Sequence, residues 1–164
     1  MEGKVLVAGL GNIFLGDDAF GVEVVKQLAS MMLPDNVVVR DFGIRSYDLA
    51  YALMESWDLV ILVDAASRDD APGTIYVIEP DLEKDDAEAG FDAHAMNPTS
   101  ALQLVKALGG HRQGKLLVVG CEPQTVEPDE SGRMGLSDAV QPSVEEAVRI
   151  IVQLLNENGK AIAA

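Results

Sequence analysis

A glycine-rich turn near the amino terminus constrains the fold most, because an apolar run leads into it and a periodic helix follows it. The apolar run is Val5–Ala8, and the turn contains Gly9 and Gly11. Apolar side chains then recur on one helical face, at Val22, Val25, Leu28, Ala29 and Met32. This order predicts the first βα unit of an open, mostly parallel sheet, whose sites lie beyond the carboxyl ends of its strands.

The rest of the chain alternates short apolar runs with helical segments. Further strands are predicted at Val37–Arg40, Asp58–Asp64, Thr74–Ile78 and Leu116–Val119. Further helices are predicted at Tyr47–Met54, from Asn97-Pro98 to Gly109, and from Pro142 to about Gly159. The alternation predicts one three-layer α/β domain over residues 1–164, with a mostly parallel five-stranded sheet and helices on both faces.

One strand is expected to run against the others. The connection from Asp64 to Thr74 is too short for a helical crossover, which needs at least about 10–12 residues. We therefore expect Thr74–Ile78 to be an antiparallel strand at an edge of the sheet.

Three helix starts carry capping signals, and one of them is Asn97, a capping residue before Pro98 at the first helical position. Asp17 is expected to cap the first helix. Ser143, with Glu146 three residues later, forms a capping-box pattern at the start of the last helix.

Composition narrows the class of partner and the compartment. The 27 acidic and 12 basic residues give a net charge of −15, which repels nucleic acids and anionic membranes. The charge is compatible with a basic protein partner, or it serves solubility alone. The single cysteine, Cys121, forms no internal disulfide and fits the cytoplasm. No apolar run reaches the roughly 20 residues that span a bilayer. No apolar stripe is left over once the core is assigned, which favours a monomer.

The first turn does not match a dinucleotide-binding fingerprint. That motif is G-x-G-x-x-G, and Phe14 stands where its third glycine belongs. Two carboxylates, Asp17 and Asp18, would also repel a pyrophosphate from the helix start. A nucleotide-binding regulator is therefore disfavoured, and a polar site that presents acid is the better interpretation.

Three residues are candidates for such a site. Asp18 follows the first predicted strand and Asp64 ends the third, so both reach the carboxyl edge of the sheet. His94 lies just ahead of a helix, in a polar segment that can reach the same edge. An Asp–Asp–His set suits nickel or zinc. The alternatives are that the two carboxylates complement helix or loop ends and that His94 makes an ordinary polar contact.

Other hydrolytic chemistries find less support in the sequence. The H-E-x-x-H motif of zinc proteases and the G-x-S-x-G motif of serine hydrolases are both missing. Cys121 is interpreted as a small buried residue rather than a nucleophile. His111 is interpreted as part of a surface turn. Asp41-Phe42-Gly43, after the second strand, could form a flexible wall of the site.

Taken together, these segments resemble the hydrogenase maturation proteases. The resemblance rests on GLGNIFLGDDAFG, on LVDAA around Asp64, on His94 before a helix, and on VVGCEP. It implies an aspartyl endopeptidase-like hydrolase that removes the carboxyl-terminal extension of a nickel–iron hydrogenase large-subunit precursor after nickel insertion. It further implies that Asp18, Asp64 and His94 contact nickel carried by that precursor. Gly43 matches a family glycine, although the chain has DFG where a double glycine is common.

The sequence leaves the chemical step open. The metal could assist attack on the peptide bond, or His94 could act as an acid or base. The same three residues would also serve a non-catalytic, nickel-dependent binder that recognises the loaded precursor without cutting it.

Overall fold

The computed structural model describes residues 3–80, 98–128 and 134–163, with side chains described as far as residue 159. The strands are β1 (Val5–Leu10), β2 (Val37–Gly43), β3 (Leu59–Ala65), β4 (Ile75–Ile78) and β5 (Lys115–Cys121). The helices are the 3₁₀ turn η1 (Gly16–Ala19), α1 (Phe20–Ala29), α2 (Ser46–Leu53), α3 (Pro98–Ala107) and α4 (Gln141–Ala163). Strands and helices alternate as predicted, and each predicted element is present.

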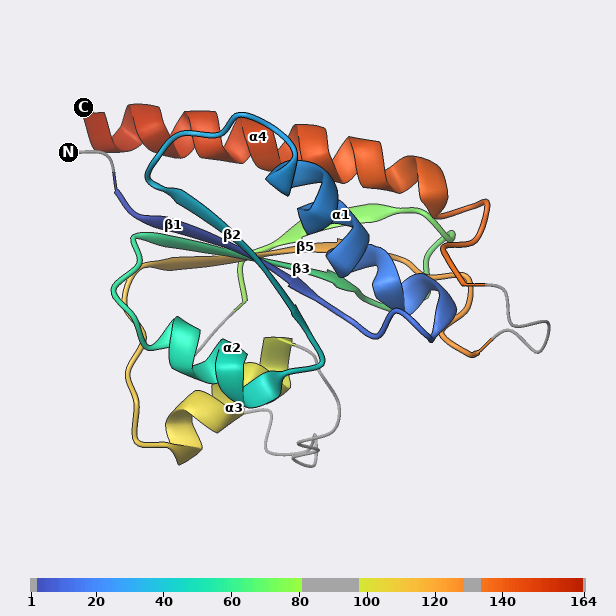
Figure 1. Ribbon diagram of the computed structural model, residues 1–164, viewed down its shortest axis with the longest axis horizontal. Coiled ribbons are helices and arrows are strands. Elements are labelled where there is room, and N and C mark those ends of the chain that lie inside the picture. Colours follow the sequence, from blue (N-terminus) through green and yellow to red (C-terminus); the bar gives the residue numbers. More distant parts are fainter. Residues whose placement is uncertain (1–2, 81–97, 129–133, 164) are drawn as a thin grey trace.

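The five strands form one sheet in the order β2-β1-β3-β5-β4. Strands β2, β1, β3 and β5 run parallel to one another. Strand β4 pairs antiparallel with β5 at the edge, as predicted from the short connection after Asp64. Helices α1 and α4 cover one face, and α2 and α3 cover the other (Figure 1). The three-layer α/β architecture is therefore confirmed.

The central strand β3 shows how the sequence builds two cores. All residues from Leu59 to Asp64 are buried, and alternate side chains pack on opposite faces. Ile61 packs in the core beneath α1 and α4, whereas Leu62 packs in the core beneath α2 and α3. A strand covered on both faces requires the continuous apolar run that the sequence shows.

The connections around β1 diverge to opposite sides of the strand. From β1 the chain passes through α1 to β2 on one side, and it then passes through α2 to β3 on the other side. Ligand sites of open α/β sheets lie where connections diverge in this way, beyond the carboxyl ends of the strands. Asp18 follows β1 and Asp64 lies near the end of β3, so both predicted carboxylates lie at this switch point.

The capping predictions for Asp17 and Ser143 are wrong, and Asn97 lies outside the described residues. Asp17 makes no capping bond to the helix it precedes, and Ser143 donates its hydroxyl hydrogen to the carbonyl oxygen of Gly73, 2.7 Å away. In each case the side chain forms hydrogen bonds with backbone groups of a distant segment instead of capping the helix.

The bounds of two helices also differ from prediction. Helix α4 continues beyond Gly159 to Ala163, because one glycine costs only about 1 kcal/mol within a helix. Met32, predicted on the buried face of the first helix, lies beyond the end of α1 and is fully exposed. Among the described residues, no helix combines the length and apolar character needed to cross a membrane.

Candidate functional site

Asp18 lies in the 3₁₀ turn between β1 and α1 and is half-buried. Its Oδ2 accepts a hydrogen bond from the amide of Asn12 at 2.8 Å. The turn packs so tightly on the end of β1 that a Cβ at Gly11 would lie 1.8 Å from the carbonyl oxygen of Asp18. Gly11 also has a φ of +137°, which favours glycine. The turn glycine therefore serves the close approach of the Asp18 backbone.

Asp64 is buried near the carboxyl end of β3, with only 3% of its surface exposed. Its Oδ1 has no hydrogen-bond partner among the described residues. Burial raises the pKa of Asp64 well above its usual value, the charge of Asp18 raises it further, and a hydrogen bond from the Ala65 amide opposes both. A buried carboxylate with one unpartnered oxygen beside a second carboxylate fits a site that takes up a cation or a proton.

Another glycine brings the two carboxylates together. Gly21 lies on the buried face of α1, and a Cβ there would lie 2.1 Å from the carbonyl oxygen of Val63 and 2.4 Å from that of Leu10. Helix α1 therefore starts in direct contact with the backbone at the ends of β1 and β3. This role of Gly21 was not predicted from the sequence, although its place three residues after Asp18 was visible.

Asp17, next to Asp18 in the sequence, binds a different part of the molecule. It is fully buried, and its two oxygens accept four hydrogen bonds. The donors are the amides of Gln124 (2.9 Å), Thr125 (3.1 Å) and Ser137 (2.7 Å) and the hydroxyl of Ser137 (2.8 Å). Asp17 thus joins the turn that carries Asp18 to the segment between β5 and α4.

Glu122 plays a similar part beyond the carboxyl end of β5, where it is buried just after the strand. It accepts hydrogen bonds from the Arg68 amide (2.7 Å), the Tyr76 hydroxyl (2.8 Å) and the Ser67 hydroxyl (3.3 Å). The bond from Arg68 is the main reason why the pKa of Glu122 is lowered. Loss of hydration and the bond to Glu122 raise the pKa of Tyr76 to about 12. Glu122 therefore fastens the loop that follows Asp64, a role not predicted from the sequence.

Cys121 is a buried core residue, as interpreted from the sequence. Its side chain is fully buried, and burial is the main reason why its pKa is raised to about 11. A thiol of this kind is a poor nucleophile at neutral pH.

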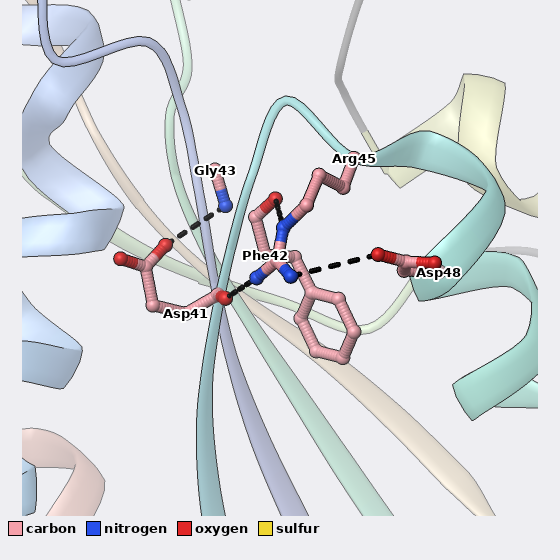
Figure 2. Close-up of polar contacts among 5 residues, drawn as sticks. All are labelled: Asp41, Phe42, Gly43, Arg45 and Asp48. Carbon is pink, nitrogen blue, oxygen red and sulfur yellow. Dashed lines mark hydrogen bonds and ion pairs between the residues drawn. The ribbon is translucent and has the colours of Figure 1, made fainter.

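The end of β2, which contains Asp41-Phe42-Gly43, and the turn before α2 are cross-braced rather than loose (Figure 2). Asp41 Oδ1 accepts from the Gly43 amide at 2.8 Å, and Gly43 has a φ of +52°. Arg45 donates to the carbonyl oxygens of Phe42 (3.3 Å) and Asp41, and it forms an ion pair with Asp48 at 3.5 Å. Three contacts from one guanidinium hold the turn, so the expectation of a flexible wall finds no support in its contacts.

Exposed apolar side chains surround the turns after β1 and β2. The amide of Gly11 donates to the carbonyl oxygen of Gly43 at 3.0 Å, which places these turns side by side. Between 40% and 66% of each side chain is exposed, and the residues are Ile13, Phe14, Ile44 and Tyr47. No such surface was predicted from the sequence.

His94, the third predicted site residue, lies outside the described residues. Within the described ranges, no group of three or more His, Cys, Asp or Glu residues could hold a metal ion. The structure thus brings Asp18 and Asp64 together, while the contribution of His94 stays a prediction. His111 is exposed, as interpreted from the sequence.

Known proteins resemble this chain over most of its length. The HycI family model, described as hydrogenase maturation protease, matches residues 22–154. A putative hydrogenase maturation protease from Methanocaldococcus jannaschii is 37% identical over 151 residues, which are 90% of this chain and 94% of the relative. The hydrogenase 2 maturation protease of Escherichia coli is 30% identical and covers 95% of this chain and 93% of its own.

Two solved structures are similar to this chain in both fold and sequence. The hydrogenase maturating endopeptidase HybD from E. coli has a TM-score of 0.74 and 31% identity, with 95% of this chain and 94% of HybD covered. A solution structure of an endopeptidase from E. coli has a TM-score of 0.76 and 30% identity, with 95% of this chain and 94% of that one covered. With two carboxylates at the switch point and agreement over nearly its whole length, this chain belongs to the hydrogenase maturation protease family, a family of peptidases.

Proposed function

We propose that this protein is an endopeptidase that removes the carboxyl-terminal extension of a nickel–iron hydrogenase large-subunit precursor after nickel has been inserted. Membership of the hydrogenase maturation protease family supports the reaction class and the kind of substrate. The observation that carries the site assignment is the unpartnered Oδ1 of buried Asp64 beside Asp18, at the switch point of the sheet.

The two carboxylates fit a metal carried by the substrate. Asp64 offers an unpartnered oxygen, and Asp18 has one oxygen bonded to Asn12. His94 would add the imidazole nitrogen that nickel favours. A bound metal supplies positive charge and polarises a peptide carbonyl. A metal that arrives already held by the substrate needs only a few open ligands on this chain.

The charges on this chain explain how the metal would control docking. With both carboxylates ionised, Asp18 and Asp64 repel each other, and burial adds to the cost at Asp64. A cation on the precursor relieves this repulsion, whereas a precursor without the metal does not. The same site therefore favours the loaded precursor.

The surface around the site fits a protein substrate. The exposed apolar side chains on the turns after β1 and β2 lie at the same sheet edge as Asp18. Apolar patches of this kind next to a polar site mark protein–protein contact. We therefore expect the precursor to bind across these turns.

Mass spectrometry of nickel-loaded and nickel-free precursor incubated with the protein tests the proposal. We expect loss of a defined carboxyl-terminal peptide from the loaded form alone. Asp18→Asn and His94→Ala should each reduce processing by at least about 100-fold, in the range of a lost catalytic group. Asp35→Asn is the matched control, because Asp35 is an exposed carboxylate in the turn before β2, at the opposite sheet edge.

Other outcomes would contradict the proposal. An intact precursor that still binds the protein would favour the non-catalytic binder. Equal processing of both precursor forms would show that nickel does not control the reaction. A cytoplasmic monomer remains part of the proposal, and size-exclusion chromatography with light scattering tests the monomeric state.

A further inference from the structure

The adjacent residues Asp17 and Asp18 have opposite environments. Asp18 is half-buried and has one hydrogen bond, from Asn12. Asp17 is fully buried and accepts four hydrogen bonds, three of them from backbone amides. These two neighbouring aspartates therefore differ in their contacts, and the proposed chemistry uses only Asp18.

The backbone around Asp17, as well as its side chain, contacts the segment after β5. Its own amide donates to the carbonyl oxygen of Thr125 at 2.8 Å. The preceding Gly16 packs on the same carbonyl, since a Cβ there would lie 3.0 Å from it, and its φ is +56°. Side chain, amide and neighbour therefore all bind the turn to the segment after β5.

The turn needs this support, because η1 has only four residues. A 3₁₀ segment of this length has poor hydrogen-bond geometry and little stability of its own. Its direction decides where the Asp18 carboxylate lies relative to Asp64. A contact that holds the backbone at residue 17 therefore also holds the side chain at residue 18.

We propose that Asp17 is a positioning residue that holds Asp18 in place for the reaction by anchoring η1 to the segments around Gln124–Thr125 and Ser137. This inference rests on the proposed function for its kinetic consequences, but its structural part stands without it. The negative charge matters, because bonds from amides to a carboxylate are stronger than bonds to a neutral acceptor. An amide group in its place would turn an N–H toward other N–H donors.

Amide hydrogen exchange on the folded protein tests the structural part. The reporter is the Asn12 amide, which is bonded to Asp18 Oδ2, and the reference is the amide of Val7 within β1. In Asp17→Asn we expect Asn12 to lose protection by at least about 10-fold relative to Val7. This fold-change corresponds to about 1.4 kcal/mol.

Glu122→Gln is the matched control, because it also replaces a buried carboxylate that accepts three hydrogen bonds at the same sheet edge. We expect it to lower the melting temperature while the ratio of Asn12 to Val7 protection stays unchanged. An unchanged ratio in Asp17→Asn, or an equal loss in both variants, would show that Asp17 supports the fold only.

Steady-state processing of the loaded precursor tests the kinetic part at a temperature where each variant is folded. We expect Asp17→Asn to reduce kcat by about 10- to 100-fold, since a displacement of about 1 Å can have this effect, with little change in KM. Ser137→Ala, which removes one of the four bonds, should give a smaller reduction.

A double variant separates positioning from general damage. If Asp17 acts through Asp18, adding Asp17→Asn to Asp18→Asn should reduce processing little further. Multiplicative losses would overturn the proposal. A wild-type protein that does not process the precursor would overturn the proposed function, while the exchange experiment would still decide the role of Asp17.

Discussion

At the scale of single residues, two of the buried carboxylates around the site have pKa values that are shifted in opposite directions. Asp64 has an unpartnered oxygen and a raised pKa, whereas Glu122 accepts three hydrogen bonds and has a lowered pKa. A pKa shift is also a statement about stability, so the two residues should give the protein opposite dependences on pH.

Asp64→Asn is expected to stabilise the protein at neutral pH. Because the folded pKa of Asp64 is raised, its contribution to stability is fully present below the unfolded value near 3.9 and is lost as pH rises through the folded pKa. A gain of about 1 kcal/mol would raise Tm by about 2–4 °C in a domain of this size. Thermal unfolding at pH 7.5 and pH 4 measures the difference, which should shrink at the lower pH. A lower Tm at pH 7.5 would contradict the argument.

Glu122→Gln is expected to destabilise the protein at neutral pH. The folded pKa of Glu122 is lowered, so its contribution is present above the unfolded value near 4.3 and is lost as pH falls through the folded pKa. Urea unfolding should show a lower midpoint for the variant at pH 7 and a smaller difference at pH 3. A difference that is as large at pH 3 as at pH 7 would mean that the bonds to Glu122 do not depend on its charge.

At the scale of elements, glycine decides how closely α1 approaches the sheet. Gly21 lies against two strand carbonyls, whereas an alanine methyl group at Gly159 in α4 would have nothing within 4 Å of it among the described residues. The helix propensity of alanine over glycine is the same at both sites, about 1 kcal/mol. The surroundings therefore determine the sign of each substitution.

Gly21→Ala should destabilise the protein by about 1–3 kcal/mol, because backbone carbonyls at 2.1 and 2.4 Å must shift. Gly159→Ala should be neutral or stabilising by up to about 1 kcal/mol. Denaturant unfolding of the two variants side by side measures both. Equal effects would show that α1 adjusts its position on the sheet.

At the scale of the whole molecule, the exposed apolar turns adjoin the carboxyl edge that carries the site. Phe14 is 66% exposed, so its removal has little effect on packing. Phe14→Ala should therefore raise KM for the precursor by at least about 3-fold, while Tm stays within about 1 °C. Met32→Ala is the control, since Met32 is fully exposed beyond the end of α1. A KM that does not change would place the docking surface elsewhere.

Much of this molecule could be predicted from its sequence. Apolar runs and helical spacing located the strands and helices, and the short connection after Asp64 predicted the antiparallel edge strand. These features depend on neighbours along the chain. Because strands that run parallel end at one edge, the positions of Asp18 and Asp64 after two strands also predicted that they lie close together.

The tertiary structure alone decided what the other polar residues do. Asp17 resembled a helix cap, yet its partners lie 107 to 120 residues away, and Glu122 binds a loop 54 residues earlier. A buried polar group bonds to whatever segment folds over it, and the spacing of nearby residues does not encode that segment. The sequence by itself therefore determined the architecture and the edge that carries the site, whereas the folded chain decided which carboxylates support the site and which face it.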